Sequence, residues 1–178
     1  ISLTAFRYHS GRAVWVREHS PEGAGIPARE LRERFSLLTF NVWFDPFYQE
    51  ARTRHLLTLL ESADADFVCL QEVLPGFLAA LLGARVVRER YSVSDISGET
   101  LGSYGVLLLA KPRALALGIA LLPSHMGRNM VFGEFATPAP AWEAAGGRVA
   151  VGTVHLESLG NAPTRREQLR LCTALLTA

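Results

Sequence analysis

The sequence predicts an α/β fold, a layered sandwich of two packed mixed sheets flanked by helices. Apolar runs alternate with amphipathic segments of helical period up to about residue 82. After that, four strand-like runs follow one another between clusters of Pro, Gly and Ser. Alternation followed by consecutive strands is typical of layered mixed sheets. The length of 178 residues and the 49% hydrophobic content suffice for one domain with a buried core.

The predicted elements follow in order along the chain. Residues 3–17 form a hairpin around the turn pair Ser10-Gly11, residues 21–27 a Gly- and Pro-rich linker, and residues 28–34 a short helix. Because an isolated hairpin is marginally stable in water, residues 1–34 are expected to end an upstream domain. The main domain is expected at 35–178, with strands at 37–42, 67–70, 104–110, 114–121, 131–135 and 149–156 and helices at 50–61, 75–82 and 164–176. The leucines expected to face the core are Leu56, Leu57, Leu59 and Leu60 in the first helix and Leu169, Leu171, Leu175 and Leu176 in the last.

Charge and cysteine content exclude several classes of protein. Eighteen basic against seventeen acidic residues give a net charge of +1, so any site for a polyanion must be local. Cys69 and Cys172 match no paired metal-ligand spacing, which favours a reducing, cytoplasmic setting. The longest nearly uncharged stretch, 114–122, is too short to span a membrane, so a soluble protein is expected. The chain starts at Ile1 and stops within a helical pattern, so we expect it to be a piece of a longer polypeptide.

Two apolar strands end in polar side chains suited to a metal site. The run 67–70 ends in Gln71 and Glu72, and the run 37–42 carries Asn41. Ligand sites in α/β sheets lie outside such carboxyl ends, and a carboxylate is a hard oxygen ligand suited to Mg²⁺. Two simpler roles stay open, since Glu72 could merely end its strand and Asn41 could satisfy the backbone of a turn.

A third strand ends in His155, with Ser158 three residues later. An imidazole at this position could stabilise a developing oxyanion or act as an acid or base, although a structural histidine is the commoner case. Together these segments resemble the endonuclease/exonuclease/phosphatase superfamily: Asn-x-Trp, then Leu-Gln-Glu about thirty residues later, then Thr-x-His-Leu-Glu-Ser. The resemblance is greatest to the 5′-tyrosyl-DNA phosphodiesterase branch, because the Met-x-Arg-Asn segment of residues 126–129 and the helical Arg165 and Gln168-Leu169 also match.

The resemblance implies a metal-dependent phosphodiesterase acting on nucleic-acid ends, single strands or 5′ ends. Asn41 and Glu72 would hold Mg²⁺, with Mn²⁺ as an alternative, and His155 would contact the scissile phosphate. Arg128 would be a second, two-point phosphate contact, although it could also be an ordinary surface arginine. Ser158 and Tyr104 would complete the substrate site.

One departure concerns the general base. The family's Gly-Asp-x-Asn segment and its later Ser-Asp-His segment do not occur here. We interpret this as truncation after residue 178, and we expect residues 1–178 alone to be inactive. Another enzyme of the superfamily, such as a nuclease, deadenylase or sphingomyelinase, and a catalytically inactive nucleic-acid-binding module remain alternatives.

Overall fold

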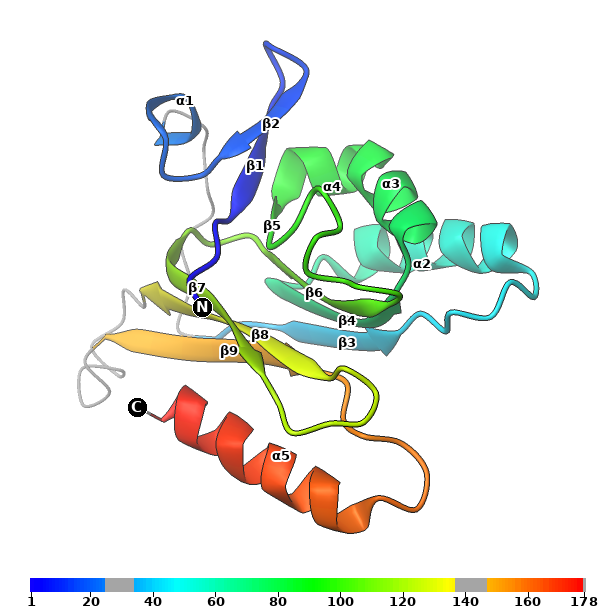
Figure 1. Cartoon of the computed structure of the whole chain (residues 1–178). Helices are drawn as coiled ribbons and strands as arrows, with labels where there is room; N and C mark the ends of the chain where they lie inside the picture. The colour runs from blue at the N-terminus through cyan, green and yellow to red at the C-terminus, as the bar shows by residue number, and fades with distance from the viewer. Residues whose placement is uncertain (25–33, 137–146, 178) are drawn as a thin grey trace.

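The computed structural model describes residues 1–24, 34–136 and 147–177, and it has two packed sheets with helices on both outer faces (Figure 1). The first sheet is mixed, because only β3 and β4 run parallel. Its strands in spatial order are β2 (Val14–Arg17), β1 (Phe6–His9), β5 (Ser92–Val93), β6 (Gly105–Ala110), β4 (Phe67–Val73) and β3 (Leu37–Asn41). The second sheet consists of β7 (Ala114–Leu121), β8 (Asn129–Ala136) and β9 (Arg148–Val154). The predicted layered α/β class is confirmed, but the described strands of the second sheet are all antiparallel and not mixed.

The helices divide between the two outer faces. Next to the first sheet lie α2 (Gln49–Ala63), α3 (Pro75–Gly83) and α4 (Arg85–Arg90), whereas α5 (Ala162–Leu176) lies against the second sheet (Figure 1). The remaining helix, α1 (Pro21–Ala24), is a single turn beside the hairpin. None of the described helices combines the length and apolar character needed to cross a membrane.

Strand β4 explains why the sheet has two buried faces. Its side chains alternate, so that Phe67 and Cys69 pack between the two sheets while Val68 and Leu70 pack against the helices. All four are at most 3% exposed. A continuous apolar run is what a strand covered on both faces requires, which is why this segment could be predicted from sequence.

The N-terminal hairpin, which the sequence was expected to place at the end of an upstream domain, is paired with the main sheet in this structure. Strand β1 pairs with β5. A buried cluster behind this pairing joins the segments: Arg7 Nε donates to Glu18 at 2.9 Å, Ser92 Oγ donates to the same carboxylate, and Ala114 N–H donates to it at 3.2 Å. Arg7 and Glu18 both belong to the hairpin segment and are 3% and 0% exposed, and the contacts of Glu18 with Ser92 and Ala114 join the hairpin to β5 and β7.

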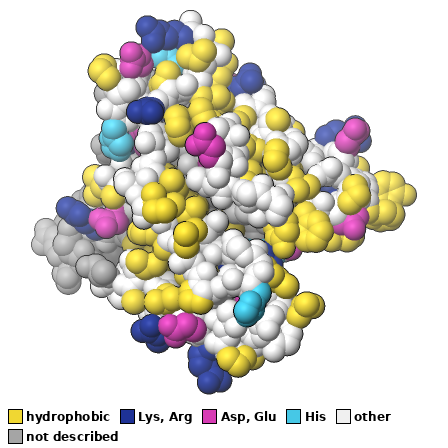
Figure 2. Space-filling model, viewed as in Figure 1, with side chains coloured by type: hydrophobic (Ala, Val, Ile, Leu, Met, Phe, Trp, Pro, Cys, Tyr) yellow, Lys and Arg dark blue, Asp and Glu magenta, His cyan; other side chains and the backbone are white. Residues whose placement is uncertain are grey.

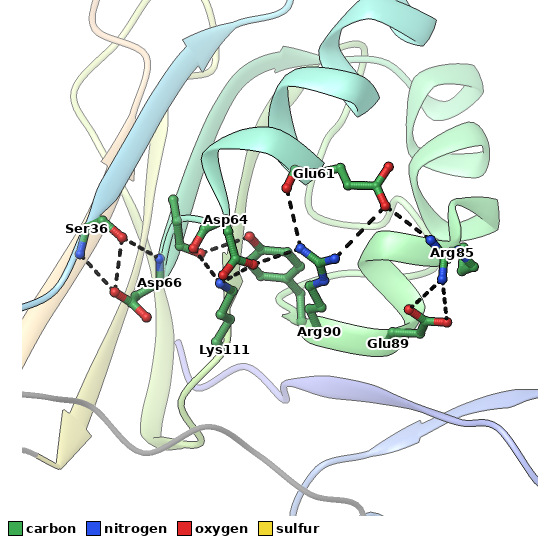
Figure 3. Close-up of polar contacts among 10 residues, drawn as sticks. Ser36, Glu61, Asp64, Asp66, Arg85, Glu89, Arg90 and Lys111 are labelled. Atoms are coloured by element: carbon green, nitrogen blue, oxygen red, sulfur yellow. Dashed lines mark hydrogen bonds and ion pairs between the residues drawn. The ribbon is translucent and has the colours of Figure 1, made fainter.

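Polar contacts just before the start of β4 fix the start of β3 and the end of α2 (Figure 3). Asp66 accepts hydrogen bonds from the backbone and hydroxyl of Ser36 at 2.9 and 3.0 Å. Asp64, just after α2, pairs with Lys111 at 2.6 Å and with Arg90 at 2.8 Å. The contacts between Ser36 and Asp66 join the start of β3 to the start of β4, and the parallel register places the carboxyl ends of both strands at the opposite edge.

Several sequence expectations differ from the structure in detail. The segment 21–24 is helical and not a linker, residues 25–27 and the helix expected at 28–33 lie outside the described residues, and Arg34 is in a bend. Helix α4 and the two-residue strand β5 were not predicted. Leu59 is 42% exposed, and in α5 Leu169 and Leu175 are 51% and 37% exposed. Helix α5 instead turns Gln168 and Cys172 inward, because Gln168 makes hydrogen bonds to the backbone of Glu157 and Pro123.

Both cysteines are buried, free thiols. Burial raises the pKa of Cys69 to about 12 and also raises the pKa of Cys172. Neither thiol is therefore a thiolate near neutral pH, which agrees with the interpretation of Cys69 as a small core residue.

Candidate active site

The candidate site lies at the carboxyl ends of the parallel strands β3 and β4. Their register places Asn41 opposite Gln71, one residue before Glu72. At Glu72 the pairing of β4 with β6 is irregular and the backbone has a φ of 59°. A left-handed glutamate is uncommon and costs free energy, and such strain gathers at functional sites. The irregularity turns the Glu72 side chain, whose residue is 8% exposed, toward Asn41.

Both oxygens of the Glu72 carboxylate are held by neighbouring donors. Asn41 Nδ2 donates to Oε1 at 2.9 Å, and the backbone N–H of Phe44 donates to Oε2 at 3.0 Å. Asn41 Oδ1 in turn accepts the N–H of Trp43 at 2.8 Å. Asn41 therefore both closes the turn, the simpler role left open, and orients the carboxylate. The contact from Phe44 was not expected, because a backbone donor leaves no trace in the sequence.

The second sheet contributes Arg128, His155 and Ser158 to the same place. Arg128 contacts His155 Nδ1 at 3.0 Å and donates to Ser158 Oγ at 3.2 Å. His155 Nε2 lies 3.6 Å from Glu72 Oε1. The residues that the sequence singled out at separate strand ends thus lie together, in one cluster that we call the polar cradle: Asn41, Glu72, Arg128, His155 and Ser158.

The protonation of His155 follows from its partners. A guanidinium can only donate, so Nδ1 of His155 accepts and its proton sits on Nε2, on the side of Glu72. Burial lowers the pKa of His155, the positive charge of Arg128 lowers it further, and Glu72 opposes them. The geometry and the net shift agree on a neutral imidazole with an N–H directed into the cradle.

Tyr104 forms one wall of the cradle. The guanidinium carbon of Arg128 lies 5.3 Å from the centre of the Tyr104 ring, and the imidazole of His155 lies 6.3 Å from it. On the same ring, Phe44 stacks at 4.8 Å with an interplanar angle of 23°. The aromatic wall orients the arginine and keeps water from one of its faces.

Arg128 is a buried cation that interacts with Glu157 only at a distance beyond that of an ion pair among the described residues. The residue is 6% exposed, and within 1–24, 34–136 and 147–177 no carboxylate forms an ion pair with it. Its Nε has no hydrogen-bond partner among those residues. Burying a cation is costly unless a partner compensates it, so the arrangement favours an anion at this position.

The loops that carry Arg128 and His155 are fastened to each other through Glu157, which is 1% exposed. Its carboxylate accepts the hydroxyl of Ser124 and the N–H of His125, which begin the segment that leads to Arg128. The Ser124 hydroxyl lowers the pKa of Glu157 and keeps it ionised. Gln168 accepts the N–H of Glu157 at 2.8 Å and donates to the carbonyl of Pro123 at 2.8 Å. Glu157 and Gln168 belong to the sequence segments that resemble the family, but the sequence did not indicate that they position these loops.

Another buried carboxylate, Asp95, shapes the loop before Tyr104. It accepts the backbone N–H groups of Ser97, Gly98 and Thr100, each at 2.8 Å, and two hydroxyls. The carbonyl of Thr100 in turn lies 3.5 Å from Nδ2 of Asn129, beside Arg128. Asp95 therefore supports the cradle from outside it. Sequence reasoning missed this, although Asp before Ser, Gly and Thr is a turn signal.

The donor set fits a magnesium ion that has few protein ligands. Within the described segments, no group of three or more His, Cys, Asp or Glu side chains could enclose a metal. Mg²⁺ commonly keeps several waters and binds one or two carboxylates together with substrate phosphate. Glu72, oriented by Asn41 and 3.6 Å from the imidazole of His155, fits that pattern, whereas a site made only of protein ligands does not.

A cavity of about 480 Å³ borders Asn41 and Glu72 on the helix side of the sheet. Its walls are mostly apolar and include Trp43, Leu59 and Phe77. Leu59 of α2, which was expected to be buried, is exposed because it lines this cavity beside the site.

Comparisons with known proteins show the family to which the chain belongs. The model of the Endonuclease/Exonuclease/phosphatase family matches residues 38–176. No curated protein sequence matches the chain significantly. Among solved structures, TDP2 of Danio rerio in complex with a single-strand DNA product is 26% identical, with a TM-score of 0.63 over 79% of this chain and 53% of that one.

More distant structures share the fold alone. TDP2 of Caenorhabditis elegans is 19% identical, with a TM-score of 0.65 over 83% of this chain and 44% of that one. A mannosyl-6-phosphatase of Bacteroides thetaiotaomicron is 14% identical, with a TM-score of 0.59 over 80% and 58%. The chain thus spans about half the length of the solved structures that it matches. By its sequence match over 38–176 and by its fold, the chain belongs to the endonuclease/exonuclease/phosphatase family.

Proposed function

We propose that the protein containing this chain is a Mg²⁺-dependent phosphodiesterase that acts on nucleic-acid ends, similar to TDP2. Arg128 carries the proposal: it is buried, forms no ion pair with a described carboxylate, and is positioned between His155 and Ser158. A phosphate supplies the negative charge that no described carboxylate places in an ion pair with this arginine. The guanidinium matches a phosphate in a two-point contact. The similarity to a TDP2 structure that holds a single-strand DNA product supports nucleic acid as the source of the phosphate.

The residues of the cradle have distinct roles in this proposal. Arg128 binds and orients the phosphate, His155 donates its Nε2–H to a phosphate oxygen, and Ser158 holds the guanidinium in place. Glu72 and Asn41 hold the metal. When bound, Mg²⁺ stabilises the negative charge that develops on the phosphate oxygens. Tyr104 shields the cradle from water on one side.

The group that activates the attacking water is not among these residues. The aspartates of the chain are Asp45, Asp64, Asp66 and Asp95, and none stands in a Gly-Asp-x-Asn segment. Asp64 and Asp66 lie at the opposite end of β4, and Asp95 is occupied by five hydrogen bonds. We therefore propose that residues outside this chain supply the base, and that residues 1–178 alone bind substrate but turn it over roughly 10²- to 10⁴-fold more slowly.

The test compares substrates on a protein extended beyond residue 178. A 5′-phosphotyrosyl oligonucleotide, a plain single strand, a sphingomyelin vesicle and a sugar phosphate are incubated with and without Mg²⁺. We expect Mg²⁺-dependent cleavage of the oligonucleotide that carries the 5′-phosphotyrosine, and loss of this cleavage when Arg128 is replaced by Ala. Preference for the lipid or the sugar phosphate would assign the site to another activity of the family, and absence of all turnover would favour an inactive binding module.

A further inference from the structure

The loop between β3 and α2 exposes an unusual amount of aromatic surface next to the polar cradle. Trp43, Phe44, Phe47 and Tyr48 are 48%, 44%, 62% and 70% exposed. Figure 2 shows hydrophobic side chains gathered at the right of the molecule, where Figure 1 places this loop. Clustered exposed aromatic side chains commonly mark a binding surface.

The loop is held firmly, so the exposure is not that of a loose segment. The N–H groups of Trp43 and Phe44 bind Asn41 and Glu72, and the N–H of Phe47 binds Asp45 Oδ1 at 2.8 Å. Arg52 donates to the carbonyls of Val42 and Trp43 at 3.1 and 2.9 Å, and also to that of Asp45. The residues that are proposed to hold the metal therefore also fix the aromatic loop. Such preorganisation lowers the entropy cost of binding.

The aromatic rings continue the wall of the cradle. Phe44 stacks on Tyr104 at 4.8 Å, and Tyr104 in turn lies beneath Arg128. The guanidinium of Arg52 lies over the Trp43 ring at 4.6 Å. Trp43 is thus in contact with Arg52, and Phe44 with Tyr104, while nearly half of the surface of each of these two aromatic residues remains exposed to solvent. A flat partner can stack on the exposed side, next to the position of the phosphate.

We propose that Trp43 and Phe44 form a stacking surface for the nucleobases adjacent to the phosphate held by Arg128. This rests on the proposed function and adds to it a reason why the substrate is single-stranded. In a duplex the bases are covered by their stacked neighbours, whereas single-strand binding sites combine a cationic phosphate site with aromatic rings that accept any base. A lipid surface is the other partner of exposed aromatic rings, but stacked rings with one covered side fit planar groups better than acyl chains.

The experiment measures binding, because binding does not depend on the missing base. Fluorescence anisotropy with Mg²⁺ compares a short 5′-phosphorylated oligothymidylate with an otherwise identical strand whose terminal nucleotides are abasic. We expect Trp43→Ala and Phe44→Ala each to weaken binding of the base-bearing strand roughly 5- to 150-fold, with little effect on the abasic strand. Phe44→Tyr should restore binding, and Leu115→Ala, an exposed apolar change at the far end of β7, should leave both affinities unchanged.

The outcomes separate this proposal from the function on which it rests. If both strands bind with equal affinity and neither aromatic variant changes that, the stacking surface is disproved while the phosphate site stands. If neither strand binds, or if Arg128→Ala does not weaken both, the proposed function itself is wrong. Binding of the wild-type chain to phosphatidylcholine vesicles, lost in the aromatic variants and without any preference for the base-bearing strand, would assign the loop to a lipid surface and overturn the proposal.

Discussion

Asn41 donates a hydrogen bond of 2.9 Å to Glu72 across two parallel strands, although the two residues are separated by 31 positions in the chain. The same asparagine closes the turn to Trp43, so one side chain links the direction of the chain after β3 to the orientation of the carboxylate. The strand pairing brings these residues together, and the left-handed conformation of Glu72 turns its side chain toward the cradle.

Replacing Glu72 by Gln removes the anionic ligand and keeps the shape. Asn41→Ala removes a residue that orients the ligand, so we expect it to lower Mg²⁺ affinity and turnover roughly 10- to 100-fold. We expect Glu72→Gln to lower both by more than this. Isothermal titration with Mg²⁺ and activity at limiting Mg²⁺ on the extended protein measure both. A circular dichroism spectrum like that of the wild type shows that the fold is retained, and unchanged activity would contradict the role.

Replacing Arg128 by Lys keeps the positive charge but removes the planar guanidinium with its parallel N–H donors. Lysine cannot contact His155 and Ser158 and present two parallel donors to a phosphate at the same time. We expect phosphate affinity to fall about 10- to 100-fold, the equivalent of one charged hydrogen bond. Titration with inorganic phosphate measures this, with Arg166→Lys on an exposed position as the matched control. Unchanged affinity in Arg128→Lys, as in the control, would show that general charge, and not the cradle, binds the anion.

Replacing Asp95 by Asn should lower stability at neutral pH and weaken its dependence on pH. Burial acts to raise the pKa of Asp95, but hydrogen bonds from Thr100, Gly98 and Ser97 outweigh it and the pKa is lowered. A carboxyl whose folded pKa is depressed stabilises the fold above its unfolded pKa, and this is lost as the pH falls through the folded pKa. Urea unfolding should therefore show a difference of about 1–3 kcal/mol between the wild type and the variant at pH 7. The difference should narrow below about pH 4, and a constant gap would contradict the assignment.

Replacing Glu18 by Gln tests whether the hairpin is part of the domain. The change removes the charge of a buried carboxylate that pairs with Arg7 and contacts Ser92 and Ala114, so we expect the free energy of unfolding to fall by about 3–5 kcal/mol. Glu167→Gln breaks an ion pair of similar length, 2.8 Å, with Arg170 on the exposed side of α5, and no measurable change is expected there. Equal stability of the two variants would show that the hairpin does not contribute to the domain's stability.

The layers and the strand ends were predictable because they depend on patterns that the sequence displays. The uninterrupted apolar run of β4 requires a strand covered on both faces, and its carboxyl end is where polar side chains collect. The residues that meet in the cradle were identified by their resemblance to the family, since no local pattern relates Arg128 to His155.

Other features could not be predicted because tertiary contacts decide them. The left-handed Glu72 and the backbone donor of Phe44 arise from the irregularity in β4. Helix α5 buries Gln168 and leaves Leu169 exposed because the Gln168 amide forms hydrogen bonds with two backbone groups. Hydrophobic periodicity does not predict such hydrogen bonds. The hairpin was assigned elsewhere because its partner, β5, has only two residues.

The central claim is that one metal held by Glu72 and one phosphate held by Arg128 share a single site. A crystal structure of the protein with Mn²⁺ and a 5′-phosphorylated single strand, with the metal located by its anomalous scattering, tests it most directly. We expect Mn²⁺ bonded to a Glu72 oxygen and to an oxygen of the phosphate, which is also bound by Arg128 and His155. A metal away from Glu72, or a phosphate that leaves Arg128 without contact, would contradict it.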